Sequence, residues 1–116
     1  MMLLPDSGVR VWLCTEPADM RCSFNGLSAR VKNKLGANPL SGHLFVFVNR
    51  KRTQMKIIYF DGSGYAIWAK RLERGSFVLG NGAPGKELIT FAQLQCLLEG
   101  IEWRDARRYR RFSLAA

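Results

Sequence analysis

The middle of the chain most strongly limits what it can fold into, because it holds three apolar segments joined by short connections. The first, Leu44–Val48, is β-branched, aromatic and apolar throughout, which is typical of a strand buried on both faces. The second and third cover residues 55–60 and 65–69. Residues 49–54 and 61–64 join the three segments, and connections this short favour antiparallel hairpins. The sequence therefore predicts a three-stranded antiparallel meander.

A strand and a helix are expected before the meander. Residues 9–13 alternate apolar and polar side chains at their start and then become apolar, which favours a short strand. Phe24, Leu27 and Val31 recur at the spacing of one helix face, and Gly36 follows where a helix would end. The pattern predicts an amphipathic helix that begins near Phe24.

The segment after the meander contains one further strand candidate and a second helix. Residues 76–79 predict a fourth short strand, and residues 80–85, rich in glycine, predict a flexible loop. Thr90 and Gln93 have the spacing of a capping box, which marks the start of a helix. Gly100 stands where the C-terminal cap of that helix is expected.

The order of these elements predicts the fold class. We expect an α+β fold, with an antiparallel β-meander of three to five strands and one or two helices packed on a face. The chain has 116 residues, of which 47% are hydrophobic. That is enough for one core, so we expect a single domain over residues 1–103 and a basic C-terminal tail over residues 104–116.

The balance of charge limits the function more than the fold. Eighteen Lys and Arg residues against nine Asp and Glu residues give a formal net charge of +9. On a small domain, such a surplus attracts polyanions, nucleic acid first among them. The alternative is a surface that favours solubility or docks on an acidic protein.

The basic residues gather at the tip of the first hairpin, after the third meander strand and in the C-terminal tail. Arginine in such places reaches phosphate oxygens, but phosphate contacts alone do not read a base sequence. Whether the three clusters share a face is left open. The candidate DNA-binding residues are Arg50, Lys51, Arg52, Lys70, Arg71, Arg74, Arg104, Arg107, Arg108, Arg110 and Arg111.

The residue patterns of common catalytic and metal sites do not occur in the sequence. Cys14 and Cys22 are separated by seven residues, and neither Cys96 nor His43 lies at zinc-site spacing from them. The carboxylates are scattered, and neither a P-loop nor a dinucleotide-binding glycine pattern is present. We therefore expect no enzyme activity, metal or cofactor, with the cysteines as small apolar side chains and His43 in a structural role.

The sequence also predicts the compartment. No apolar run is long enough to cross a membrane, and the first residues, MMLLPD, do not resemble a signal peptide. Three cysteines without the spacing of a disulfide framework favour reduced thiols. We expect a cytoplasmic protein without a membrane partner.

Five segments in order resemble one protein family. They are VRVWL (9–13), ADMRCSFNGL (18–27), LSGHLFVFVNR (40–50), KIIYFDG (56–62) and WAKRLERGSF (68–77). Together they resemble the accessory TnpB (Orf2-like) proteins of the insertion-sequence-sixty-six (IS66) family of bacterial transposable elements. This family is distinct from the RNA-guided nucleases that share the name.

The resemblance implies a non-catalytic accessory role in DNA transposition, beside a larger transposase that carries the catalytic carboxylates. The expected partners are transposon-end DNA and the transposase. The alternative is a protein–protein adaptor that does not bind DNA directly. The candidate partner-binding residues are Asp19, Met20 and Arg21, although Asp19 also has the position of a helix cap.

The chain departs from the family pattern at two places. The pattern usually continues after Met20-Arg21 with Lys-Gly, where this chain has Cys22-Ser23. It often has glycine at the hairpin tip, where this chain has Lys51-Arg52-Thr53. Among the other polar residues of the matching segments, we expect Asn49 to form a turn and Glu73 to pair with a nearby arginine.

Overall fold

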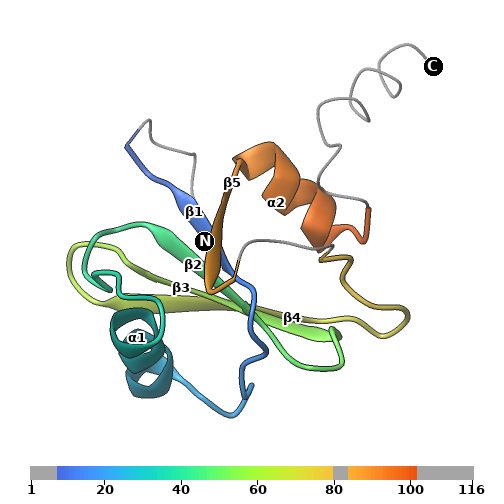
Figure 1. Ribbon diagram of the computed structural model, residues 1–116, viewed down its shortest axis with the longest axis horizontal. Coiled ribbons are helices and arrows are strands. Elements are labelled where there is room, and N and C mark those ends of the chain that lie inside the picture. Colours follow the sequence, from blue (N-terminus) through green and yellow to red (C-terminus); the bar gives the residue numbers. More distant parts are fainter. Residues whose placement is uncertain (1–7, 80–83, 102–116) are drawn as a thin grey trace.

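The computed structural model describes residues 8–79 and 84–101. These residues form five strands and two helices (Figure 1). Every element except β5 was predicted within a few residues of its place. In chain order they are β1 (Val11–Cys14), α1 (Phe24–Asn33), β2 (Leu44–Val48), β3 (Gln54–Phe60), β4 (Tyr65–Arg71), β5 (Lys86–Ile89) and α2 (Phe91–Leu98).

The five strands form one sheet in the order β4-β3-β2-β1-β5. β2, β3 and β4 are the predicted antiparallel meander, in which Val46 lies opposite Ile57 and Ile57 opposite Trp68. β1 is parallel to β2 and antiparallel to β5. The parallel pair arises because the chain crosses over through α1 between β1 and β2, as parallel neighbours require. The α+β prediction is confirmed, with a mostly antiparallel sheet.

The two helices cover opposite faces of the sheet rather than one face (Figure 1). On one face, Val46 and its neighbours pack with Leu97 of α2. On the other face, Phe45 packs with Leu27 and Val31 of α1. All five residues of β2 are buried, because each face of this central strand has its own core.

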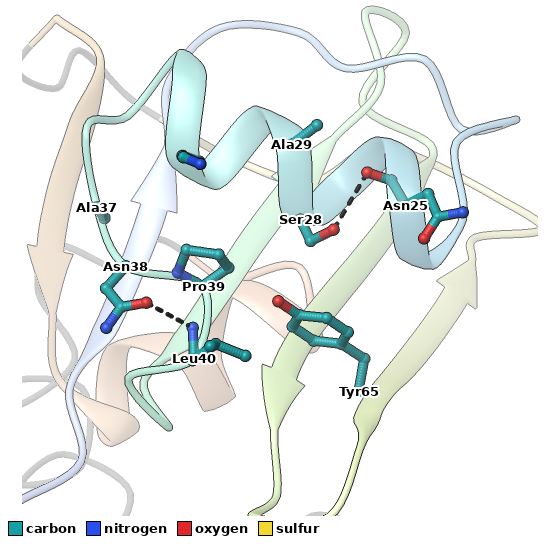
Figure 2. Close-up of a pocket in the computed structure, with 9 residues that line it drawn as sticks. Asn25, Ser28, Ala29, Ala37, Asn38, Pro39, Leu40 and Tyr65 are labelled. Carbon is teal, nitrogen blue, oxygen red and sulfur yellow. Dashed lines mark hydrogen bonds between the residues drawn. The ribbon is translucent and has the colours of Figure 1, made fainter.

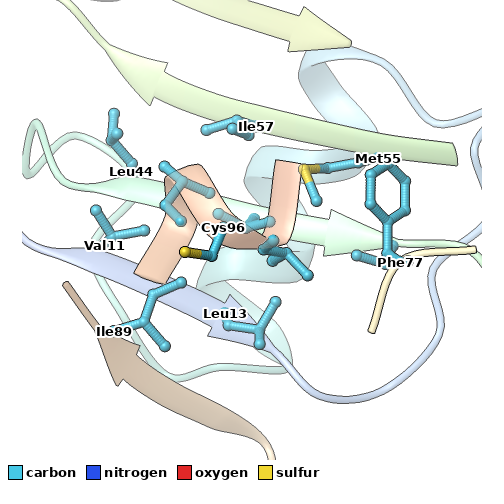
Figure 3. Packing of buried hydrophobic residues seen from close by; sticks show 12 residues of the cluster. Val11, Leu13, Leu44, Met55, Ile57, Phe77, Ile89 and Cys96 are labelled. Atoms are coloured by element: carbon cyan, nitrogen blue, oxygen red, sulfur yellow. The ribbon is translucent and has the colours of Figure 1, made fainter. Parts of the chain in front are cut away.

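The prediction of a strand over residues 76–79 is wrong. Phe77 from this segment is instead a buried plug, 1% exposed, beside Met55 in the α2-side core (Figure 3). The missed strand is β5, which pairs along the otherwise open edge of β1. Its sequence, Lys-Glu-Leu-Ile, has two charged residues and gives no strand signal. Most of the predicted loop at 80–85 lies outside the described residues.

The caps of α2 are confirmed and the predicted cap of α1 is wrong. Thr90 Oγ1 accepts from the Gln93 N–H at 3.0 Å, and Gln93 Oε1 accepts from the Thr90 N–H at 2.8 Å. Gly100, just past α2, has a φ of 76°. α1 begins after Ser23 without a side-chain cap, since the carboxylate of Asp19 is bound within its own loop.

Three lysines fasten segments outside the sheet to the strands. Each donates its ammonium group to a backbone carbonyl in a part-buried setting, and two of these carbonyls lie at or just after the C-terminal end of a helix, where a cation is favourable. The pairs are Lys56 with Cys22 at 2.8 Å, Lys70 with Leu98 at 2.8 Å and Lys86 with Leu35 at 3.0 Å.

Candidate nucleic-acid interface

The turn between β2 and β3 is held by one asparagine. Asn49 Oδ1 accepts from the Thr53 N–H at 2.8 Å and the Gln54 N–H at 3.1 Å. The Asn49 carbonyl accepts from the Arg52 N–H at 3.0 Å. An asparagine side chain bound to nearby backbone stabilises a turn. The prediction of Asn49 as a turn former is confirmed, and the turn is a fixed support for the side chains it carries.

Those side chains are Arg50, Lys51 and Arg52, and all three are exposed. Among the described non-glycine residues, Arg52 is the one with a positive φ, at 60°. This left-handed conformation costs an ordinary residue roughly 1–2 kcal/mol. The turn therefore keeps a long cation at a position where the backbone favours glycine.

The cluster after β4 lies against this turn. Arg71 at the end of β4 is opposite Gln54 in the sheet register. The Leu72 N–H donates to the Thr53 carbonyl at 2.8 Å, and the Phe77 N–H donates to the Arg52 carbonyl at 2.7 Å. Exposed Arg74 lies in the loop between these two contacts. Backbone contacts thus bring the segments that carry two of the three predicted basic clusters side by side.

The predicted partner-binding segment reaches the same end of the sheet. The Ala18 N–H donates to the Val48 carbonyl at 3.0 Å, directly before the β2–β3 turn. In the next residues, the Asp19 carboxylate binds the Arg21 guanidinium at 2.7 Å and the Arg21 N–H at 2.9 Å. The bonds from Arg21 lower the pKa of Asp19 to about 2. Met20 is half-buried against the α1-side core, while the Arg21 side chain is 91% exposed.

We call residues 19–21, 50–52 and 70–74 together the basic end. They contain seven basic side chains and two acidic ones, Asp19 and Glu73. Glu73 pairs with Arg71 at 3.2 Å, as predicted, and both side chains are exposed. Such exposed pairs contribute about 0–1 kcal/mol, so they leave the arginines able to exchange partners. In Figure 1 the turn after β2 and the segment after β4 lie at one end of the sheet, away from α1.

Lys70, a member of the predicted DNA-binding set, has a role in holding the fold together. Lys70 gives its ammonium group to the Leu98 carbonyl at 2.8 Å and so ties the end of α2 to β4. The predicted tail cluster lies outside the described residues. It consists of Arg104, Arg107, Arg108, Arg110 and Arg111.

A groove of about 630 Å³ lies near the other end of β4, between α1, residues 37–40 and Tyr65. Its α1 wall is the stripe Asn25, Ser28, Ala29 and Lys32. Figure 2 shows Tyr65 reaching up between this wall and the 37–40 segment, with Leu40 beside it. Sequence reasoning missed the groove, although small and polar residues at helical spacing opposite Leu27 and Val31 were its signal.

Comparison with known proteins settles the family. Residues 9–108 match the family described as IS66 Orf2 like protein. The chain belongs to the IS66 Orf2-like family. Two similar proteins come from Sinorhizobium fredii (strain NBRC 101917 / NGR234). The uncharacterized protein y4hO is 47% identical over 103 residues, which is 89% of this chain and 90% of the relative. The uncharacterized protein y4jC is 34% identical over 107 residues, 92% of each. No solved structure matches the chain.

The two departures of this IS66 Orf2-like protein from the family pattern have local explanations. Arg52 takes the left-handed position that a glycine would occupy without strain. Cys22 is half-buried against the α1-side core. A Cβ added to Gly26 would lie 3.0 Å from the Cβ of Cys22, so glycine at 26 leaves room for the thiol.

The remaining chemically active side chains of the IS66 Orf2-like protein have structural environments. Burial raises the pKa of the Cys14 thiol, the opposite of what a nucleophilic cysteine needs. His43 Nδ1 accepts from the Arg10 N–H at 3.0 Å, which confirms its structural role. Within residues 8–79 and 84–101, no group of three or more His, Cys, Asp or Glu could hold a metal ion. In the same part of the chain, no helix is long and apolar enough to span a membrane.

Proposed function

We propose that this accessory protein of transposition binds the DNA of its insertion sequence through the basic end. IS66 Orf2-like proteins accompany the transposition machinery and are not known as catalysts. The contribution to transposition that we propose for this chain is DNA binding through its basic surface.

The observation that carries the proposal is the meeting of residues 50–52 with residues 71–74. The contacts of Leu72 with Thr53 and of Phe77 with Arg52 hold the two segments together through backbone hydrogen bonds. The arginines are therefore spaced by a rigid support and not only by their own flexible side chains. Exposed guanidinium groups carried on such a support suit contacts with the phosphates of a duplex.

Such a surface binds phosphate with little preference for base sequence. Each neutralised phosphate releases counterions, so affinity falls steeply as salt rises. Discrimination of the element end then comes from the transposase or from further contacts by this chain. The tail arginines 104–111 are expected to add phosphate contacts.

The test is a titration of the purified protein into two labelled duplexes, one an element end and one scrambled, over a series of salt concentrations. Strong, salt-dependent binding to both supports a phosphate-binding helper. Preference for the element end adds sequence reading to the same function. No binding at moderate salt overturns the proposal.

The groove beside α1 favours a second function, docking of the transposase. α1 has no acidic residue, and Lys32 lines the groove together with the apolar Leu40 and Pro39. Leu40 is 55% exposed and lines the groove, so its apolar side chain is available to a partner there. We expect the groove to take an apolar segment of the transposase that also carries carboxylates.

A pull-down with the tagged transposase tests this docking. Leu40→Glu should reduce capture at least tenfold, because it places a charge in the groove. Leu88→Glu is the matched control, since Leu88 is 50% exposed on β5, outside the groove. Equal capture of both variants and of the unchanged protein would exclude the groove as the docking site.

A further inference from the structure

The outer edge of β4 is a long strand edge without a strand beside it in the described part of the chain. β4 has seven residues, and its only neighbour in the sheet is β3. The opposite edge strand, β5, has only four residues. An edge strand leaves a row of backbone N–H and C=O groups ready to pair with another strand.

The hydrogen bonds at the two ends of the β3–β4 hairpin show which groups point outward. The Asp61 N–H donates to the Gly64 carbonyl, and the Leu72 N–H donates to the Thr53 carbonyl. In an antiparallel pair, directly bonded positions alternate with unbonded ones. Counting inward from both ends, the even residues of β4 bond to β3, and the odd residues direct their N–H and C=O groups away from it. The outward residues are Tyr65, Ile67, Ala69 and Arg71.

The side chains of β4 do little to block pairing at this edge. Exposed edges are usually protected by charges, proline or bulges. The first five residues of β4, Tyr-Ala-Ile-Trp-Ala, have none of these protections, and its two charges, Lys70 and Arg71, stand at one end. Ala69, near the middle of the outward set, is small and exposed.

The positions of the charges on β4 favour antiparallel over parallel pairing with β4 of a second copy of the chain. A second copy of β4 aligned in parallel would place Lys70 beside Lys70 and Arg71 beside Arg71, which is destabilising. Aligned antiparallel about Trp68, each Arg71 faces Tyr65 of the second copy, and each Lys70 faces Ala66. In the same register Ile67 faces Ala69, so all four outward residues of each strand find bonded partners.

We propose that the protein forms a dimer through antiparallel pairing of β4 with β4 of a second copy, which joins the two sheets into one of ten strands. The two-fold axis of such a pair is perpendicular to the sheet. It places the two basic ends at opposite ends of the joined strands. The dimer therefore offers two separated phosphate-binding surfaces, and this inference does not depend on whether those surfaces bind DNA.

The test is sedimentation of the full chain without DNA over a range of protein concentrations. We expect the unchanged protein to sediment at twice the mass of one chain at the highest concentrations. Ala69→Pro removes one outward N–H and none of the bonds to β3, so it should shift dissociation to at least tenfold higher concentration. Ala69→Thr keeps the N–H and is the matched control, expected to stay dimeric.

A second measurement keeps the test decisive if the proline variant does not fold. Amide exchange of the unchanged protein is followed by NMR on dilution. Loss of protection at Ile67 and Ala69, with protection at Ala66 and Trp68 retained, supports the dimer. A monomer at every concentration, or a dimer in which the Ile67 and Ala69 amides exchange freely, overturns it.

Discussion

At the scale of single residues, Arg52 combines a strained backbone conformation with a proposed contact to DNA. Its φ of 60° places a side chain where glycine is favoured. Its carbonyl accepts the Phe77 N–H at 2.7 Å, which holds the β2–β3 turn against the segment that follows β4. A glycine would keep this backbone geometry and lose the cation. The residue is thus a site where stability and the proposed DNA binding can be separated.

Two substitutions at this position separate the effects. Arg52→Gly should raise the free energy of unfolding by about 1 kcal/mol, because the left-handed strain is relieved. Arg52→Ala removes the same charge and keeps the strain, so its stability should stay close to that of the unchanged protein. Both variants should weaken DNA binding to a similar extent. Chemical unfolding and DNA titration of the two variants check both expectations. A loss of stability in Arg52→Gly would contradict the inference that the backbone at Arg52 is strained.

Asp19 predicts how the loop before α1 responds to acid. Hydrogen bonds from Arg21 lower its folded pKa from the ordinary 3.8 to about 2. A lowered folded pKa stabilises the fold above the ordinary value, and this contribution is lost as the pH falls through the folded pKa. The stability that the Asp19–Arg21 bonds contribute should therefore be complete at pH 5 and decline from about pH 4 to about pH 2, where the folded carboxylate itself becomes protonated.

The measurement is an NMR titration of the Asp19 carboxyl carbon, with Arg21→Gln as the comparison. In the unchanged protein the midpoint should lie near pH 2. In Arg21→Gln it should return toward the ordinary aspartate pKa of 3.8. Identical midpoints would show that Arg21 does not hold the carboxylate.

At the scale of elements, lysine side chains help fix the helices on the sheet. Lys86 donates to the Leu35 carbonyl just after α1, and its ammonium group also lies 5.0 Å from the centre of the Trp12 ring. The first contact satisfies a carbonyl near the helix end, and the second is a cation–π interaction. One side chain of β5 thus joins α1 to β1.

Lys86→Met keeps the stem and removes both contacts of the ammonium group. It should lower the free energy of unfolding by about 2 kcal/mol, the range of a hydrogen bond made by a charged group. Lys34→Met, at the exposed end of α1, is the control and should change stability by less than about 0.5 kcal/mol. Urea unfolding of the unchanged protein and the two variants checks the difference. Equal stabilities of all three would show that the Lys86 ammonium group does not stabilise the fold.

Elements with a strong local signal could be predicted from the sequence, and elements that depend on a distant partner could not. The unbroken apolar run of β2 and the Thr90–Gln93 capping box determine their structures locally. β5 forms only because β1 has a free edge, and its Lys-Glu start shows no strand preference. The apolar residues around Phe77 predicted a strand, but the Phe77 side chain is instead buried in the core beside Met55. The basic clusters were visible in the sequence, whereas their meeting depends on the Leu72 and Phe77 backbone contacts.

At the scale of the whole molecule, the basic residues behind the net charge of +9 have different roles. Lys56, Lys70 and Lys86 stabilise the fold through backbone carbonyls. The exposed arginines of the basic end are supported by the β2–β3 turn and remain accessible. The α1 groove lies at the opposite end of β4. The surface proposed to bind DNA and the groove proposed to dock the transposase therefore do not overlap within one chain.

We propose that DNA binding comes from the basic end and not from the overall charge of the protein. The most direct measurement is the salt dependence of DNA affinity for two triple variants that lose the same charge. One is Arg50→Gln, Lys51→Gln and Arg74→Gln at the basic end, and the other is Arg30→Gln, Lys32→Gln and Lys34→Gln on α1. We predict that the basic-end variant loses about 0.9 of slope in log affinity against log salt for each phosphate contact removed, while the α1 variant keeps the slope of the unchanged protein. Equal slopes and equal losses of affinity in the two variants would contradict the claim.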